Sequence, residues 1–156
     1  MADAELDGII KAIKNEITYT MVRQIEPCRK MFAQHAENDV LDKYSPTAYQ
    51  RRSENGAFNG TTGIADERSY EVTVQDLTMK IESCVQGNPR YESSRDGWDP
   101  GDITGIIESG HGYNWKSSEI YRHPIPRPWM EQAGDDFVDN LLGPMIDIAL
   151  TNLLGG

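Results

Sequence analysis

The sequence predicts an α+β fold with a long kinked N-terminal helix, a small antiparallel sheet, a short helix and a C-terminal helix packed on the sheet. Near both ends of the chain, apolar residues recur every three or four positions, which is the period of one helix face. Over residues 70–82, apolar and polar residues alternate as in a half-buried strand. The chain of 156 residues suits one domain, residues 1–156, with enough hydrophobic material for a modest core.

The N-terminal helix is predicted from two apolar stripes in series. The first stripe consists of Leu6, Ile9, Ile10, Ile13, Ile17 and Met21. Pro27 has no backbone N–H and its ring clashes with the preceding turn, so we expect a break or kink near residues 25–26. A second stripe, which contains Cys28 and Phe32, then continues to about Leu41.

The middle of the chain predicts a small sheet and a short helix. The apolar alternation shifts by one residue between Val74 and Leu77, so residues 75–76 mark a tight turn or a bulge in a sheet with one buried face. Residues 100–109 carry isoleucines on one helix face, and Gly110 is placed to be a left-handed C-terminal cap.

The C-terminal helix is expected to begin near Pro128 or Trp129. Its predicted inner face consists of Met130, Ala133, Phe137, Leu141 and Leu142. The Gly143-Pro144 pair should kink or split the helix. The stripe continues beyond the pair with Met145, Ile148, Ala149 and Leu153.

Two long loops are predicted at about residues 42–69 and 111–128, where glycine, proline and polar residues interrupt any period. Loops of this length are usually functional or are ordered by a partner. They and the segments beside them carry tyrosine, tryptophan and arginine, the residue types that dominate protein–protein contacts. We expect contacts, within the subunit or between subunits, at Tyr44, Tyr49, Arg51, Arg52, Trp98, Tyr113, Trp115, Arg127 and Trp129. The alternative is that the aromatic residues fold back and cover the core.

Composition excludes some classes of protein. The net charge of −10 repels nucleic acid at long range, so a sequence-specific DNA or RNA reader is disfavoured. The same charge suits a channel along which DNA slides, although plain solubility is the commoner reason for it. We find no apolar run of about 20 residues and no secretory signal, so we expect folding in a cytoplasm. Cys28 and Cys84 are expected to be reduced thiols, mostly buried.

The sequence offers little catalytic chemistry. It contains no motif that supplies a nucleophile with its base, and no histidine has metal-ligand spacing with another histidine or a cysteine. His111 and His123, in the second loop, are the residues that an acid–base hydrolase or nuclease would use. Surface histidines are far commoner, so we expect a non-enzymatic protein with no catalytic residues, no cofactor and no metal.

Three segments resemble small tail-component proteins of phages that infect Gram-positive bacteria. Residues 44–52, ahead of a glycine-containing loop, are similar to their Y-x-P-x-x-Y-x-R-R stretch. Residues 106–115 resemble the I-[IV]-E-x-G-x-G-Y-x-W segment, with Ser109 where that family more often has an aromatic residue. Residues 126–130 resemble the R-P-[FW] motif that opens the C-terminal helix. The three segments occur in the family's order, and the resemblance covers about residues 40–150.

The resemblance implies a non-enzymatic structural protein of the virion at the head–tail neck, a head–tail joining or tail-completion subunit. It implies a ring of six copies of the chain that joins the head connector to the tail, with acidic side chains around the DNA channel. The implied partners are further copies, head-completion or connector proteins, the tail terminator and the tail tube proteins. Genomic DNA would pass through the lumen without specific binding, no membrane would be involved, and assembly would take place in the host cytoplasm. The alternatives are a tail terminator that caps the tail tube and a minor head or decoration protein.

Overall fold

The computed structural model describes residues 2–43, 63–85, 103–110 and 125–155. Within these ranges the helices and strands follow the predicted order, and the α+β class is confirmed. They are α1 (Ala2–Arg23), α2 (Ile25–His35), β1 (Tyr70–Gln75), β2 (Thr78–Ser83), α3 (Ile103–Ser109), α5 (Trp129–Phe137) and α6 (Gly143–Leu154). A π-helical turn, Ala36–Leu41, extends α2, and a second one, Val138–Leu142, joins α5 to α6.

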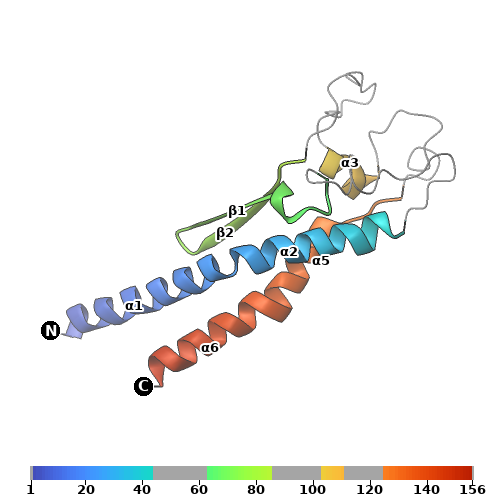
Figure 1. Cartoon of the computed structure of the whole chain (residues 1–156). Helices are drawn as coiled ribbons and strands as arrows, with labels where there is room; N and C mark the ends of the chain where they lie inside the picture. Colours follow the sequence, from blue (N-terminus) through green and yellow to red (C-terminus); the bar gives the residue numbers. More distant parts are fainter. Residues whose placement is uncertain (1, 44–62, 86–102, 111–124, 156) are drawn as a thin grey trace, which may run out of the picture.

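Helices α1 and α2 form a long bar on which the other elements are arranged (Figure 1). The β-hairpin lies along one side of the bar, and the C-terminal helix runs back along it, with α5 on α2 and α6 on α1. The main partners of the C-terminal helix are therefore the other helices, whereas we expected the sheet. The difference has a physical reason: the hairpin has two strands only, and its apolar face is already occupied by the α1–α2 bar.

The break between α1 and α2 falls at Gln24, one residue before the predicted position. Pro27 cannot donate the hydrogen bond that would reach the carbonyl of Arg23 in a continuous helix. The chain instead passes through Gln24 with φ −90° and ψ 3°, and the amide of Cys28 donates to the Gln24 carbonyl at 2.9 Å. The two helices therefore continue in nearly the same direction.

The predicted shift between the strands is a tight two-residue turn. Gln75 pairs with Thr78, and the residues between them, Asp76 and Leu77, have φ angles of 47° and 63°. Two consecutive positive φ angles match the twist of the flanking strands. The register pairs Val72 with Ile81 on the apolar face, which turns toward the helices.

The core lies where α2, α5 and the start of β1 meet. Its largest fully buried side chains are Trp129, Tyr70, Phe137, Ile64, Ile107 and Cys28. Three aromatic rings pack in series: the centroids of Phe32 and Tyr70 are 5.7 Å apart, and so are those of Tyr70 and Trp129. Such tilted and edge-on pairs add to the energy of area burial. The core thus sits at one end of the bar, far from the two chain termini (Figure 1).

The C-terminal helix begins at Trp129, as predicted, and its irregularity is the π-helical turn ahead of Gly143 and Pro144. A proline inside a helix loses one backbone hydrogen bond and crowds the preceding turn. The wider turn at Val138–Leu142 accommodates it without breaking the rod. The helix therefore reaches Leu154 as one irregular rod.

Candidate functional site

Residues from two of the segments that carry the resemblance meet at one place in the fold, which we call the motif joint: residues 106–110 of α3 and its cap, and residues 125–130 at the start of α5. The backbone N–H of Arg127 donates to the carbonyls of Ile107 at 3.2 Å and Glu108 at 3.1 Å. These bonds hold the chain before α5 against the end of α3. The two segments are separate in sequence, and no local pattern indicated this contact.

Gly110 closes the joint. It has φ +72°, and its amide donates to the carbonyl of Ile106 at 3.0 Å, which confirms the predicted left-handed cap of α3. A Cβ at this position would lie 2.8 Å from the carbonyl carbon of Ile125 and from the nitrogen of Pro126. Both the backbone angle and the close approach of the second segment therefore require glycine.

Glu108 caps α5 from outside the helix. Pro128, at the N-cap position, makes no side-chain cap, and the amide of Met130 donates to Oε1 of Glu108 at 2.6 Å. A carboxylate at a helix N-terminus satisfies a free N–H group and lies at the positive end of the helix dipole. Burial raises the pKa of the Glu108 carboxyl, the hydrogen bond from Met130 acts in the opposite direction, and the nearby charge of Glu131 raises it further.

We expect Glu108→Ala to lower the free energy of unfolding by about 0.5–2 kcal/mol, because the cap is lost. Glu108→Gln keeps an acceptor oxygen and should cost less. Since the folded-state pKa lies above the ordinary value, folded protein binds the proton more readily than unfolded protein does. This group's contribution therefore falls as pH rises from that ordinary value through the folded-state pKa. In urea unfolding curves, the Gln variant should lose the pH dependence of stability that the Glu108 carboxyl contributes. If the Ala and Gln variants lost the same free energy of unfolding, the cap would be contradicted.

Trp129 fixes the motif joint to the core. Its side chain is fully buried and meets the ring of Tyr70 edge-on, while the Tyr70 hydroxyl donates to the carbonyl of Ile64. Burial raises the pKa of Tyr70 far above its ordinary value, so the hydroxyl stays protonated. Among the described residues, the indole Nε1–H of Trp129 finds no acceptor. The contacts that Trp129 makes here lie within the subunit.

Of the other predicted contact residues, only Arg127 lies in the described part of the chain. Arg127 is half-buried at the motif joint. Outside the described residues lie Tyr44, Tyr49, Arg51, Arg52, Trp98, Tyr113 and Trp115. His111 and His123, the histidines of the hydrolase alternative, also lie outside the described residues, so the structure does not test that alternative.

A second polar cluster, which we did not predict, joins α2 to α5. Nδ1 of His35 lies 2.7 Å from Asp39 and its Nε2 lies 3.0 Å from Asp136, while Lys43 pairs with Asp39 at 2.9 Å. Burial alone would raise the pKa of Asp39, but the hydrogen bonds from Lys43 and His35 bring that pKa below its ordinary value. The two ring nitrogens of His35 thus connect a carboxylate of its own helix with one on α5, and we call this cluster the clamp. The spacing of four residues along the helix was the available signal.

The described residues contain two free cysteines and no group of three or more metal-ligating side chains. Burial raises the pKa of the Cys28 thiol to about 12, which leaves almost none of it as the nucleophilic thiolate. Cys84 is exposed, so the expectation that both thiols are mostly buried is wrong for this residue. It follows the end of β2, where its amide donates to the carbonyl of Ser69 at 2.8 Å and its side chain lies at the surface.

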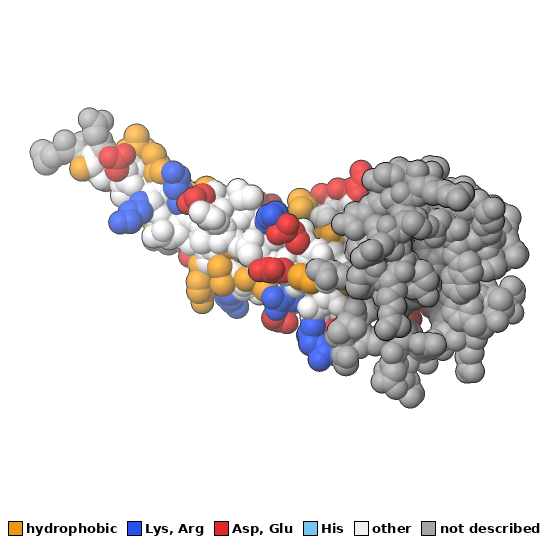
Figure 2. Space-filling view, turned by 90° about the horizontal axis from the view of Figure 1, so that it is seen from above, with side chains coloured by type: hydrophobic (Ala, Val, Ile, Leu, Met, Phe, Trp, Pro, Cys, Tyr) orange, Lys and Arg blue, Asp and Glu red, His pale blue; other side chains and the backbone are white. Residues whose placement is uncertain are grey.

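Hydrophobic side chains are exposed near the two termini. We call this surface the terminal apolar face, and it consists of Leu6, Ile9 and Ile10 of α1 together with Ile148, Leu153 and Leu154 of α6. Their exposed fractions run from 39% to 64%. The projecting N-terminal end of α1 carries part of it, as hydrophobic side chains at its surface show in Figure 2. Exposed apolar patches of this kind usually mark contacts with other molecules.

The sequence model of the family described as YomN matches residues 5–147, which is nearly the whole chain. The chain belongs to the YomN family. No curated protein and no solved structure matches it. Both halves of the motif joint, and the α1 part of the terminal apolar face, fall inside the part that matches the YomN family.

Within the described part of this YomN-family chain, one helix is long and apolar enough to cross a membrane by length and composition alone, Trp129–Leu154. Only 11% of its most apolar window is buried. We did not expect such a segment, because Gly143-Pro144 and the acidic residues interrupt the apolar run. Asp139 and Asp147 lie on this helix and are exposed, and a carboxylate at the centre of a bilayer costs about 2.5–3.5 kcal/mol.

Proposed function

We propose that this chain is a structural, non-enzymatic subunit of the head–tail joint of a long-tailed phage. In this role, copies of the chain form a ring between the head connector and the tail, around the channel through which DNA passes. The ring binds the neighbouring proteins of the particle and catalyses no reaction. The proposal joins the resemblance in residues 40–150 to the surface properties of the described residues.

The terminal apolar face is the observation that carries this proposal. No residue of α6 is buried, although the helix is apolar on nearly every side, and Ile148 is 56% exposed. A helix that is hydrophobic all round is normally buried. A chain that functioned alone would leave this surface in water, so its presence favours a protein built to be covered by other chains.

The acidic side of the C-terminal helix supports the proposed place around DNA. From residue 128 to residue 155 the chain contains no lysine, arginine or histidine. Its exposed carboxylates include Glu131, Asp135 and Asp139, besides Asp136, which contacts His35. A row of like charges repels phosphate groups and lets DNA slide without binding. The proposal places this row toward the lumen.

The motif joint gives a structural role to residues that resemble those of tail-component proteins. The resembling residues Glu108, Gly110 and Trp129 each have a structural task there: a helix cap, a left-handed turn and a buried anchor. The resemblance therefore includes residues that build the fold of this chain.

In vitro assembly tests the proposal. DNA-filled heads and separate tails, collected from an infection in which the gene for this chain is deleted, should join into infectious particles when purified chain is added. Binding of the chain to tail ends alone, before any head is present, would favour the tail-terminator alternative. Particles that join and infect without the chain would overturn the proposal.

A further inference from the structure

We propose that copies of this chain associate through the terminal apolar face, with the projecting end of α1 of one copy packed on α6 of the next. This inference deepens the proposed function, because it assigns the contact that would build the ring. The burial, packing and charge of the described residues also support it independently of that function.

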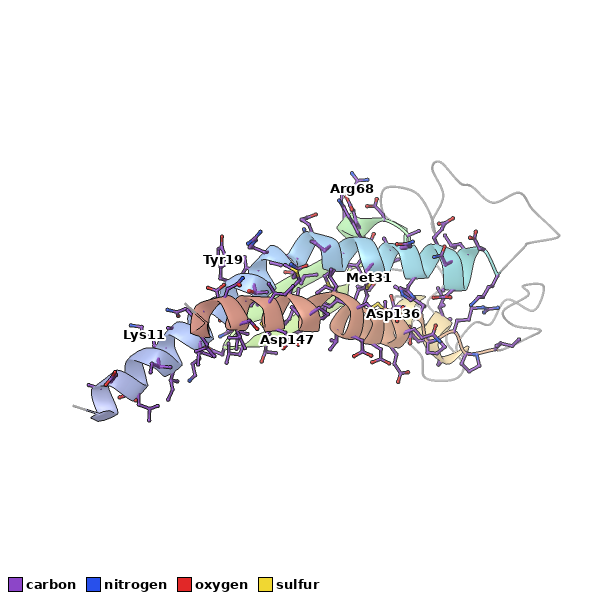
Figure 3. The ribbon with its side chains drawn as sticks, turned by 90° about the horizontal axis from the view of Figure 1, so that it is seen from below. Lys11, Tyr19, Met31, Arg68, Asp136 and Asp147 are labelled. Atoms are coloured by element: carbon purple, nitrogen blue, oxygen red, sulfur yellow. The ribbon has the colours of Figure 1, made fainter. Side chains whose placement is uncertain are left out.

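The projecting end of α1 is a helix without a core beneath it. Every residue from Ala4 to Ala12 is exposed, and α1 reaches beyond the end of α6 in two views (Figures 1 and 3). Isolated helical segments of this length are marginal in water. Yet the segment carries Leu6, Ile9 and Ile10 on one side, so an apolar surface that covers them would also stabilise the helix.

The apolar stripe of this segment continues a stripe that already packs within the chain. At helical spacing, Leu6, Ile10, Ile17 and Met21 share one face of α1. Met21 is buried and Ile17 is partly buried in the core cluster, on the helix that packs against α6. The face of α1 that fits α6 inside the subunit thus extends, uncovered, past the end of its own α6. The α6 helix of a second copy would receive it on the side that does not pack within its own subunit.

Helix α6 has a free side for that second contact. Ile146 turns toward the core, whereas Ile148 and Leu154 are 56% and 64% exposed. The helix has 12 residues and is therefore about 18 Å long, enough to cover the exposed segment of α1. Each α6 can accordingly pack on the α1 of its own chain and receive the α1 end of another.

Charge favours this pairing over the packing of α6 on a second α6. The C-terminal helix bears carboxylates and no basic residue, and Asp147 lies on α6 beside the apolar side chains. Two such helices would repel one another. Lys14 is exposed on α1, one helical turn after Ile10 and beside the apolar stripe, where it can face Asp147 of a neighbour. The two surfaces differ, so the contact is heterologous and repeats from copy to copy.

Sedimentation velocity of the purified full chain over a range of concentrations tests the contact. Wild type should form oligomers. Ile9→Ser/Ile10→Ser, on the α1 side, and Ile148→Ser/Leu154→Ser, on the α6 side, should each weaken association about 100-fold or more. The matched control is Val22→Ser, which removes an apolar side chain that is 48% exposed on the other side of α1 and should associate as wild type does.

Mixing the two double variants provides the sharper result. The α1-side variant keeps an intact α6 and the α6-side variant keeps an intact α1, so an equal mixture should form heterodimers and stop there. A Lys14→Glu variant should also associate more weakly, with recovery on mixing with Asp147→Lys. Wild type that stays monomeric at all concentrations, or variants that associate unchanged with unaltered circular dichroism, would overturn the inference.

Two further outcomes separate this inference from the proposed function. Co-sedimentation of wild type with phosphatidylglycerol–phosphatidylethanolamine vesicles, abolished by the same double variants, would assign the face to a membrane and overturn the contact. Joined particles that form with the association-deficient variants would show that this contact does not build the ring, and they would leave the neck function standing. If the chain associates through this face but is absent from the neck, the contact stands and the proposed neck function fails.

Discussion

Replacing Trp129 with alanine is expected to lower the free energy of unfolding by about 3–5 kcal/mol, more than any other single substitution proposed for this chain. The side chain is fully buried, packs edge-on against Tyr70 at 5.7 Å and connects α5 to the core. A loss of this size is a large part of the stability of an ordinary domain, so the variant should be partly unfolded at 37 °C. Urea unfolding followed by circular dichroism measures it.

The matched control is Trp129→Phe. No described residue accepts a hydrogen bond from the indole nitrogen, so phenylalanine loses ring volume and no observed polar contact. We expect about half or less of the loss seen with alanine. An alanine variant that unfolds within about 1 kcal/mol of wild type would show that the core does not depend on this anchor.

Replacing Gly110 with alanine is expected to cost about 2–4 kcal/mol. The φ angle of +72° disfavours any side chain, and the added Cβ would stand 2.8 Å from backbone atoms of Ile125 and Pro126, which have no flexible end to move away. The substitution should therefore separate the two halves of the motif joint. Amide hydrogen exchange at Arg127 and Met130 should accelerate together with the loss of stability.

Gly134 supplies the comparison within the same chain. It lies in α5, and a Cβ there would meet only the Cζ atom of Phe32, at 4.0 Å. Gly134→Ala should leave stability unchanged or raise it by up to about 1 kcal/mol, because alanine favours the helix. If both alanine variants had the same effect, the left-handed angle and the close approach at Gly110 would not be what requires glycine there.

Much of the fold could be predicted because the periodic signals were local. The stripes of α1 and α2, the alternation around Val72, the C-cap at Gly110 and the start of α5 at Trp129 are each fixed by neighbours in sequence. The position of the break at Gln24 was off by one residue. A proline determines which bond is lost, and the packing of the two helices then decides where the chain bends.

The contacts between distant segments could not be predicted in the same way. Nothing local announces that Glu108 caps a helix that begins 21 residues later, or that Asp136 completes the clamp around His35. The partner of the C-terminal helix was also assigned to the sheet, because periodicity tells which face is apolar and not what covers it. The terminal apolar face shows the same limit: all its residues except Leu154 were predicted as helix faces, and their exposure became visible only in three dimensions.

Electron cryo-microscopy of intact virus particles, produced in cells that carry the gene for this chain, tests the proposed neck role most directly. We predict a ring of density between the head connector and the tail tube. The α1–α2 bar and the C-terminal helix should fit it, with the α1 end of each copy against α6 of the next. Density for this chain elsewhere in the particle, or particles that contain none of it, would contradict that role.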